Sequence, residues 1–171
     1  MIIRRADLDD VTDASQVVAA VAEEGFLGAQ PPVDLEDRAK QFRELVERGG
    51  PAGVWVLEDD DGHVVGHAAV QESVPGVLSI EMAILPEARG RGGGRALVRA
   101  VQEHAKASGA HKVSLEVWTD NARAIALYAA AGFEVEGLRR EHYRRRDGSL
   151  RSTLIMAWRV PPREDPALAG N

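Results

Sequence analysis

Apolar residues recur at helical spacing in four stretches of this chain. The stretches cover residues 11–22, 35–48, 95–108 and 121–131. A glycine stands soon after the end of each stretch, and an aspartate or asparagine precedes the second and the fourth. These are the usual signals for ending and starting a helix. The pattern therefore predicts about four amphipathic helices.

Shorter stretches, in which apolar residues alternate with polar ones or follow one another directly, predict strands. They cover residues 2–3, 54–57, 64–70, 77–85, 112–118, 133–143 and 150–160. Asp61-Gly62 and Asp147-Gly148 lie between neighbouring stretches and are typical of hairpin turns. The element order predicts one α/β (α+β) domain over residues 1–160, with a mixed, mostly antiparallel sheet of about seven strands. Residues 161–171 lack apolar periodicity, so we expect a mobile tail there.

The composition fits an ordinary globular domain. The chain has 171 residues, 44% of them hydrophobic and 28% charged, and no apolar run approaches the roughly 20 residues that cross a bilayer. Its start lacks the apolar core of a secretory signal, so we expect a soluble, cytoplasmic protein with no membrane partner. The net charge of −6 disfavours nucleic acid as a partner. With no cysteine and with scattered histidines, the sequence predicts no metal site.

One local pattern indicates chemistry. The run Arg89-Gly90-Arg91-Gly92-Gly93-Gly94-Arg95 stands between an apolar strand and an amphipathic helix. Glycines let main-chain N–H groups turn toward a ligand, and the first N–H groups of a helix lack partners and carry partial positive charge. The run therefore predicts an anion site, such as a phosphate site. It lacks the Lys-Ser/Thr of a P-loop, and antiparallel hairpins precede it, which disfavours a dinucleotide-binding fold.

The same run is the first of two motifs that resemble the GCN5-related N-acetyltransferases. In that family an arginine or glutamine, two residues, a glycine, one residue and then a glycine or alanine follow one another, and Arg89, Gly92 and Gly94 match them. One strand later the family has an asparagine, an alanine three residues on, a Leu-Tyr pair and a Gly-Phe pair. This chain matches them with Asn121, Ala124, Leu127, Tyr128, Gly132 and Phe133. The predicted element order agrees with the family over residues 1–160.

The resemblance implies acetyl-coenzyme A as co-substrate and a sheet in which one parallel strand pair splays apart. The pyrophosphate is expected on the main-chain amides of the glycine run, and the pantetheine arm is expected along the end of the preceding strand. A main-chain N–H near Ile84 would polarise the thioester carbonyl. The expected co-substrate-binding residues are Ile84, Leu85, Arg89, Gly90, Arg91, Gly92, Gly93, Gly94, Arg95 and Asn121. Asn121 is either a helix cap or a ligand, and relatives usually carry an apolar residue where Gly93 stands, which predicts a lost packing contact.

Two side chains are candidates for the chemistry of acetyl transfer. By resemblance, Tyr128 stands where relatives use a tyrosine hydroxyl to protonate the coenzyme A sulfur, and packing on the core is its structural alternative. Glu81 is isolated on a strand face otherwise made of small side chains. We expect it to deprotonate the amine directly or through a water. Holding a cationic acceptor, or pairing with an arginine, are the alternatives for Glu81.

The acceptor is expected to be a primary amine, either on a small molecule or at a peptide N-terminus. Glu23 and Glu24, at the end of the first helix, suggest a cationic acceptor. Arginines gather about Asp147-Gly148, either as a solvated hairpin end or as a docking surface for an acidic partner or a ligand phosphate; they are Arg139, Arg140, Arg144, Arg145, Arg146 and Arg151. The long edges of the last strands leave room for a homodimer. A non-catalytic acyl-CoA sensor on the same fold is the alternative function.

Overall fold

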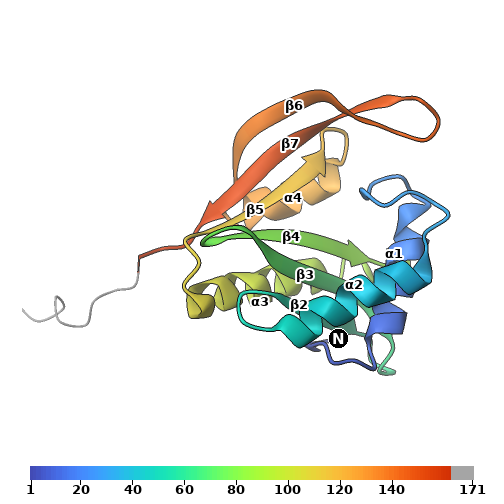
Figure 1. The fold of residues 1–171 in the computed structure, drawn as a ribbon, viewed down its shortest axis with the longest axis vertical. Helices are drawn as coiled ribbons and strands as arrows, with labels where there is room; N and C mark the ends of the chain where they lie inside the picture. Colours follow the sequence, from blue (N-terminus) through green and yellow to red (C-terminus); the bar gives the residue numbers. More distant parts are fainter. Residues whose placement is uncertain (163–171) are drawn as a thin grey trace, which may run out of the picture.

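The computed structural model describes residues 1–162 of the chain (Figure 1). Along these residues the elements are β1 (Ile2–Arg5), α1 (Val11–Ala22), α2 (Leu35–Arg48), β2 (Gly53–Glu58), β3 (Val64–Val74), β4 (Val77–Ile84), the 3₁₀ helix η1 (Pro86–Ala88), α3 (Gly93–Ser108), β5 (Lys112–Trp118), α4 (Ala122–Ala130), β6 (Glu134–Arg144) and β7 (Leu150–Arg159). The mobile tail expected over residues 161–171 lies, from residue 163 onward, outside these described residues. The domain boundary at residue 160 stays a prediction.

Within residues 1–162 the strands form a seven-stranded sheet in the order β1-β2-β3-β4-β5-β7-β6. β4 and β5 run parallel, whereas the other neighbouring pairs are antiparallel. The parallel ladder joins residues 77–79 of β4 to residues 112–114 of β5 and then stops. Figure 1 shows β5, β6 and β7 turning away from β2, β3 and β4. The predicted mixed sheet with four flanking helices and a splayed parallel pair is confirmed for the described residues.

Alternation along the central strands sends side chains into cores on opposite faces of the sheet. Val54 and Val56 of β2 pack with Phe42 of α2 and with apolar residues of α1. Trp55 and Leu57, the residues between and after them, pack with α3 on the other face. Helices α1 and α2 thus cover one face, and α3 lies on the opposite face beside α4 (Figure 1). In residues 1–162, no helix combines the length and the apolar character needed to span a bilayer.

The predicted helix starts and strand ends differ from the structure in small ways. Asp34 caps α2 by accepting the N–H of Asp37 at 3.0 Å, and Asn121 caps α4, so an aspartate and an asparagine at the two predicted helix starts are the caps. Strand β3 continues to Val74, although the apolar alternation ends at Val70. Ladder hydrogen bonds are made by the main chain, so the exposed residues 71–74 pair with β4 without any apolar pattern.

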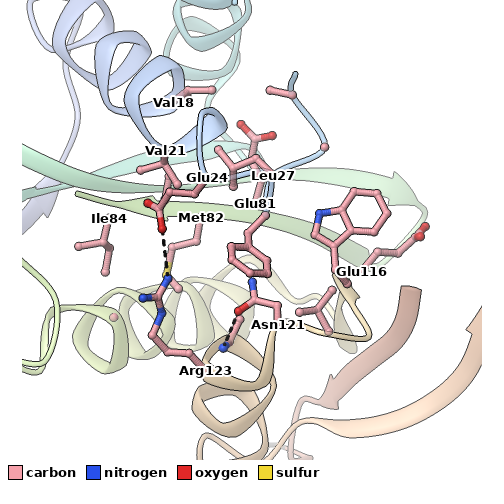
Figure 2. A pocket seen from close by; sticks show the side chains of 18 of the residues that line it. Val18, Val21, Glu24, Leu27, Glu81, Met82, Ile84, Glu116, Asn121 and Arg123 are labelled. Atoms are coloured by element: carbon pink, nitrogen blue, oxygen red, sulfur yellow. Dashed lines mark hydrogen bonds and ion pairs between the residues drawn. The ribbon is translucent and has the colours of Figure 1, made fainter. Parts of the chain in front are cut away.

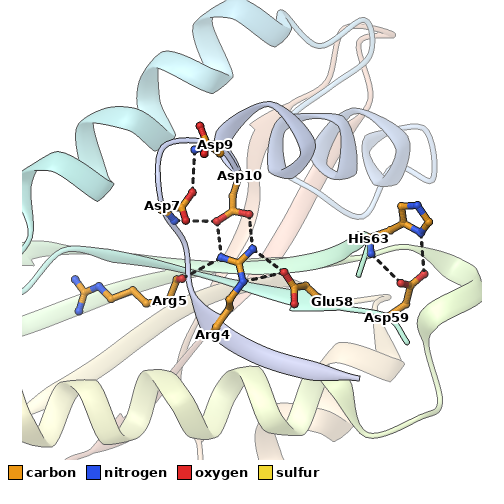
Figure 3. Close-up of polar contacts among 8 residues, drawn as sticks. All are labelled: Arg4, Arg5, Asp7, Asp9, Asp10, Glu58, Asp59 and His63. Carbon is orange, nitrogen blue, oxygen red and sulfur yellow. Dashed lines mark hydrogen bonds and ion pairs between the residues drawn. The ribbon is translucent and has the colours of Figure 1, made fainter. Parts of the chain in front are cut away.

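Arg4 ties β1 to the start of α1 and to β2 (Figure 3). Its guanidinium donates to both carboxylate oxygens of Asp10 at 2.7 Å and to Glu58 at 2.8 Å. The hydrogen bond from Arg4 holds the pKa of Asp10 below its usual range, although burial of the carboxyl group opposes this. Asp10 therefore remains ionised at the point where α1 begins, and it fixes that end of the helix against the sheet.

Candidate active site

A cavity of about 660 Å³ opens where β4 and β5 separate (Figure 2). Its wall combines the end of α1, the α1–α2 loop, β4, the glycine run, β5, the start of α4 and the β6–β7 hairpin. In Figure 2, Met82 and Ile84 come from β4, and Asn121 and Arg123 come from the opposite wall at α4. The fold thus brings residues of both sequence motifs to the same site.

The glycine run forms the turn that leads into α3. Gly90 and Gly92 have φ values of 76° and 88°, a left-handed conformation that residues with a Cβ disfavour. The first hydrogen bond inside α3 runs from the N–H of Ala96 to the carbonyl of Gly92 at 3.1 Å. The N–H groups of residues 93–95 therefore have no acceptor within the helix. Gly92, Gly94 and Arg95 line the cavity, so the positive end of a 16-residue helix faces it.

Packing explains two further glycines of the run. A Cβ at Gly93 would lie 2.5 Å from Cδ2 of Leu57, and a Cβ at Gly94 would lie 3.1 Å from Cδ2 of Leu127. Leu57 is only 1% exposed, so its side chain has little room to move. The predicted loss of a packing contact at Gly93 is therefore wrong, because Leu57 of β2 fills the space that a side chain would take.

The main-chain N–H of Arg89 and the side chain of Arg91 have partners within the described structure, and binding of the pyrophosphate by these two residues stays a prediction. The N–H of Arg89 donates to Pro86, and its guanidinium donates to the carbonyl of Ile84 at 2.8 Å and to both carboxylate oxygens of Glu24. Arg91 pairs with Asp60 at 3.0 Å and is not part of the cavity wall. Among the described residues, the main-chain N–H groups without a hydrogen-bond partner therefore begin after Arg89. The side chain of Arg89 joins the segment that follows α1 to the end of β4.

Glu24 was expected to attract a cationic acceptor, and the structure gives it another role. The hydrogen bonds from Arg89 lower the pKa of Glu24, with a smaller contribution from Arg123 at 4.0 Å (Figure 2). Its negative charge is thus already matched by arginines of the co-substrate end of the cavity. Glu24 consequently offers little free charge to an acceptor.

Ile84 and Leu85 present their main-chain groups in opposite directions. The N–H of Leu85 donates to Val65 of β3 at 2.9 Å, and its carbonyl accepts from Ala88. Both groups of Leu85 thus have partners, and Leu85 is absent from the described cavity wall, so its contact with the pantetheine arm stays a prediction. Because main-chain groups alternate along a strand, those of Ile84 face away from β3, toward the side that β5 has left.

Tyr128 lies in α4 and lines the cavity, although its side chain is largely buried. Its ring packs beside Phe133, with the ring centroids 5.5 Å apart. Burial raises the pKa of Tyr128 to about 12. The hydroxyl therefore keeps its proton at neutral pH, as a general acid must before the reaction. Tyr128 thus packs on the core and also lines the cavity, so its two predicted interpretations are compatible.

Asn121 makes the helix cap that was one of its two predicted roles. Its Oδ1 accepts the N–H of Ala124 at 3.2 Å, and its carbonyl accepts the N–H of Ile125. The same residue lines the cavity beside the start of α4 (Figure 2). Capping fixes the orientation of the side-chain amide, whose NH₂ group is a donor that a ligand could use.

Glu81 projects from β4 on the face of the sheet that carries α1 and α2. One carboxylate oxygen accepts from Arg38 of α2 at 2.9 Å and lies 4.0 Å from Nε2 of His67. The side chain of Glu81 is 51% exposed and lines the cavity (Figure 2). The pairing with an arginine, one of the predicted alternatives, is therefore present, and it leaves the carboxylate open to solvent and to an acceptor.

His67 was not singled out from the sequence, yet it lies beside Glu81 in the cavity wall. It is 1% exposed, and its Nδ1 is a buried side-chain atom without a hydrogen-bond partner in the described structure. Its ring meets the edge of Phe42 at a centroid distance of 4.9 Å. Burial, and then the charge of Arg38, lower the pKa of His67 to about 3. The imidazole is therefore neutral at physiological pH.

Glu116 is a second carboxylate that the sequence reasoning missed as a site residue. It lies on β5 across the cavity from Glu81 (Figure 2). Its oxygens accept from Arg139 at 2.7 Å, from the Tyr143 hydroxyl at 2.9 Å and from the Thr153 hydroxyl at 2.8 Å. The strand alternation, in which Glu116 faces away from the apolar residues 115 and 117, was the signal that could have revealed it.

The arginines of the β6–β7 hairpin reach back to the α1–α2 loop. Arg145 donates to the carbonyls of Leu27 and Gly28, Arg146 donates to that of Pro31, and Arg151 donates to that of Gly25. Arg145 and Arg151 also stack on the ring of Trp118, with centroid distances of 5.4 Å and 4.7 Å. The cluster is thus more than a solvated hairpin end, because it closes one side of the cavity.

A possible cation-binding group lies outside this site, in the β2–β3 hairpin. Asp59, Asp61 and His63 bring their ligand atoms within 4.8 Å of one another, which the scattered histidines of the sequence did not suggest. The N–H groups of His63 and Asp61 both donate to Asp59, and they lower its pKa. These bonds explain why the three residues lie close together in a turn. Figure 3 shows the contacts between Asp59 and His63.

The described residues thus combine a splayed parallel strand pair with a glycine run and an open helix start at its mouth. The model of the Acetyltransferase (GNAT) family matches residues 19–133. The chain therefore belongs to the GNAT family of acetyltransferases, as the two sequence motifs indicated.

Individual relatives agree with the family assignment. An L-methionine sulfoximine/L-methionine sulfone acetyltransferase of Pseudomonas paraeruginosa is 31% identical over 63% of this chain and 64% of the relative. A ribosomal-protein-alanine N-acetyltransferase of Brucella melitensis superposes with a TM-score of 0.84 at 25% identity, over 94% of this chain and all of that one. A phosphinothricin acetyltransferase of Sinorhizobium meliloti in complex with AcCoA gives 0.83 at 22% identity, over 93% and 88%. The chain spans less than two thirds of the length of the first curated relatives it matches.

Proposed function

We propose that this chain transfers the acetyl group of acetyl-CoA to a primary amine, which attacks the thioester directly while both substrates are bound. The observation that carries the proposal is the cavity between β4 and β5. It combines unpaired N–H groups at the start of α3 with a protonated, buried Tyr128 and an open carboxylate at Glu81. Family membership and the AcCoA complex of a structural neighbour support acetyl-CoA as the donor.

In this proposal the pyrophosphate of the donor binds the N–H groups that follow Arg89, because helix starts attract anions. The pantetheine arm pairs with the main-chain groups of β4 that β5 no longer uses, as an added strand would. The N–H of Ile84 is the donor available to the thioester carbonyl, where it would stabilise the negative charge of the tetrahedral intermediate. Asn121 contributes its side-chain NH₂ group to the pantetheine arm.

The side chains then divide the proton transfers. An amine attacks only when neutral, so Glu81 takes its proton, directly or through a water. Attack forms the C–N bond, and collapse of the intermediate breaks the C–S bond. Tyr128 gives its proton to the departing thiolate. Its raised pKa of about 12 keeps that proton available through the neutral range.

The relatives point to two kinds of amine acceptor. One relative is described as acting on L-methionine sulfoximine or sulfone, and a structural neighbour as acting on a ribosomal-protein alanine. We carry over only the shared chemistry, a primary amine. We place the reaction in the cytoplasm, and a homodimer formed through β6, the strand of the last hairpin that lies at the sheet edge, is part of the same proposal.

The test is release of the coenzyme A thiol from acetyl-CoA in the presence of an amine panel. The panel includes methionine sulfone, a peptide that begins with alanine, and simple alkylamines. Thiol release that depends on an amine, together with the N-acetylated product, supports the proposal. Tight binding of acetyl-CoA without turnover of any amine would instead make the chain an acyl-CoA sensor.

A further inference from the structure

Arg145 lines the cavity without forming an ion pair with a carboxylate of residues 1–162, as does its neighbour Arg144. Several arginines of this wall and its rim are paired with carboxylates: Arg38 with Glu81, Arg89 with Glu24 and Arg151 with Asp120. Arg145 donates only to the neutral carbonyls of Leu27 and Gly28, at 3.1 Å and 3.3 Å. Among residues 1–162, no carboxylate forms an ion pair with it.

The surroundings of Arg145 favour the binding of an anion to its guanidinium. Burial, and then the positive charge of Arg151, lower its pKa, and the more weakly acting Asp147 opposes them. Asp147 accepts the N–H and hydroxyl of Ser149 and belongs to the hairpin turn. One face of the guanidinium is covered by Trp118. A partly desolvated arginine with no matching carboxylate is a favourable site for an oxyanion.

Carboxylates lie a short way along the same wall. The Tyr143 hydroxyl donates to Glu116, and the Tyr143 ring meets Trp118 edge to face at 5.4 Å, so two aromatic rings connect Glu116 to Arg145. Glu81 lines the opposite side of the cavity. The acceptor end thus has acidic groups suited to an ammonium ion and, beyond the aromatic rings, a guanidinium that has no carboxylate partner among residues 1–162.

We infer that the acceptor is a zwitterion of the α-amino acid type, whose acidic group binds Arg145 while its amine lies near the carboxylates. This inference rests on the proposed acetyl transfer, since it assigns the acceptor of that reaction. A peptide N-terminus, whose first carboxyl group is an amide, lacks the anion that Arg145 would bind. Arg145 thereby becomes a residue that determines acceptor specificity.

The experiment compares α-amino acids with their carboxamides, which keep the amine and remove the negative charge. For wild-type protein, the acids should show the lower KM. Arg145→Gln should raise the KM of the acids by about 10- to 100-fold and leave that of the carboxamides nearly unchanged, because a charge-assisted hydrogen bond is lost only with the acids. Arg145→Lys should restore part of the preference. Arg159→Gln removes the same charge from an exposed ion pair outside the described cavity wall and serves as the control.

Binding separates this inference from the proposed reaction. Calorimetry with CoA present should show the acids binding wild-type protein more tightly than Arg145→Gln, whether or not turnover occurs. Equal loss for acids and carboxamides would overturn the inference, because Arg145 would then only hold the α1–α2 loop. Two results for wild-type protein would also overturn the inference: tighter binding of the carboxamides than of the acids, or binding of neither. An Arg145→Gln variant whose main defect is a loss of acetyl-CoA affinity would overturn it as well. Amine-dependent thiol release in those cases would leave the proposed function intact.

Discussion

Tyr128 and Glu81 face the cavity from different elements, and their surroundings suit opposite proton transfers. Tyr128 is shielded from water in α4, where burial raises its pKa to about 12. Glu81 is 51% exposed on β4 and shares its charge with Arg38. A buried phenol retains its proton, which suits Tyr128 to the proposed acid role, and an amine can reach the exposed carboxylate of Glu81, which suits Glu81 to the proposed base role.

Replacing Tyr128 with Phe tests the acid. The variant keeps the aromatic packing against Phe133 but loses the hydroxyl proton, so turnover should fall by about 100-fold or more while acetyl-CoA affinity stays close to that of wild type. Steady-state rates and calorimetric titration measure the two effects. A Phe variant with wild-type turnover would remove the acid role from Tyr128.

Glu81→Gln tests the base. The variant should lower turnover by about 100-fold and change the pH–rate profile, since Gln cannot accept the amine proton. Glu116→Gln is the matched comparison, because Glu116 faces the same cavity but already accepts three hydrogen bonds. If the pH–rate profile changes with the Glu116 variant and not with the Glu81 variant, the base has been assigned to the wrong carboxylate.

Residue types at the site were largely predictable, whereas their partners were not. The motifs identified Gly92, Gly94, Asn121 and Tyr128, because glycine, cap and aromatic requirements are local. The pairing of Arg89 with Glu24 spans 65 residues, so no local pattern could indicate it. The same limit explains why the main-chain partners of Leu85, and the position of His67 beside Glu81, emerged only from the fold.

At the scale of elements, the proposed function makes binding of acetyl-CoA depend on the turn from η1 into α3. Gly92→Val places a β-branched residue at a φ of 88°, which costs roughly 1–2 kcal/mol, so the turn should rearrange and misdirect the N–H groups that follow. The variant should weaken acetyl-CoA affinity by at least about tenfold, measured by calorimetry. Gly109→Val, at φ 77° at the other end of α3, imposes similar strain outside the described cavity wall and is the control. Equal acetyl-CoA affinity in the Gly92 variant and wild type would contradict this role of the turn.

Element identities were predictable wherever side-chain periodicity was strong. The strand at 54–57 was found because its alternate residues are buried in opposite cores, and the strand at 112–118 because Val113, Leu115 and Val117, buried in one core, alternate with polar residues. Residues 71–74 of β3 were missed because their side chains are exposed and only the main chain pairs them with β4. The splay between β4 and β5 was expected from family resemblance alone, since no residue pattern reports where a ladder stops.

At the scale of the whole molecule, His67 links stability to pH. The folded protein holds it neutral with a pKa of about 3, whereas the unfolded chain has the ordinary value of about 6.5. Below pH 6.5 the unfolded state binds the extra proton, so stability falls as the pH decreases through this range toward 3. Between pH 7 and pH 5 this contribution should amount to about 2 kcal/mol.

Denaturant unfolding of wild type and His67→Leu at both pH values measures the effect. Leucine does not titrate, so its loss of stability between pH 7 and pH 5 should be smaller than that of wild type by about 2 kcal/mol. Burial also lowers the pKa of His104. Its contribution to the pH dependence is present in both proteins and therefore cancels in the comparison. Equal losses in the two proteins would mean that His67 is not held neutral by the fold.

The central claim is that the N–H groups at the start of α3 bind the diphosphate of acetyl-CoA while the thioester lies beside Ile84. Titration of ¹⁵N-labelled protein with acetyl-CoA, followed by amide NMR, addresses it directly. We expect the largest downfield amide shifts at residues 92–95, with a further shift at Ile84, since these N–H groups gain acceptors. Saturable binding with shifts confined to other parts of the chain would contradict the account.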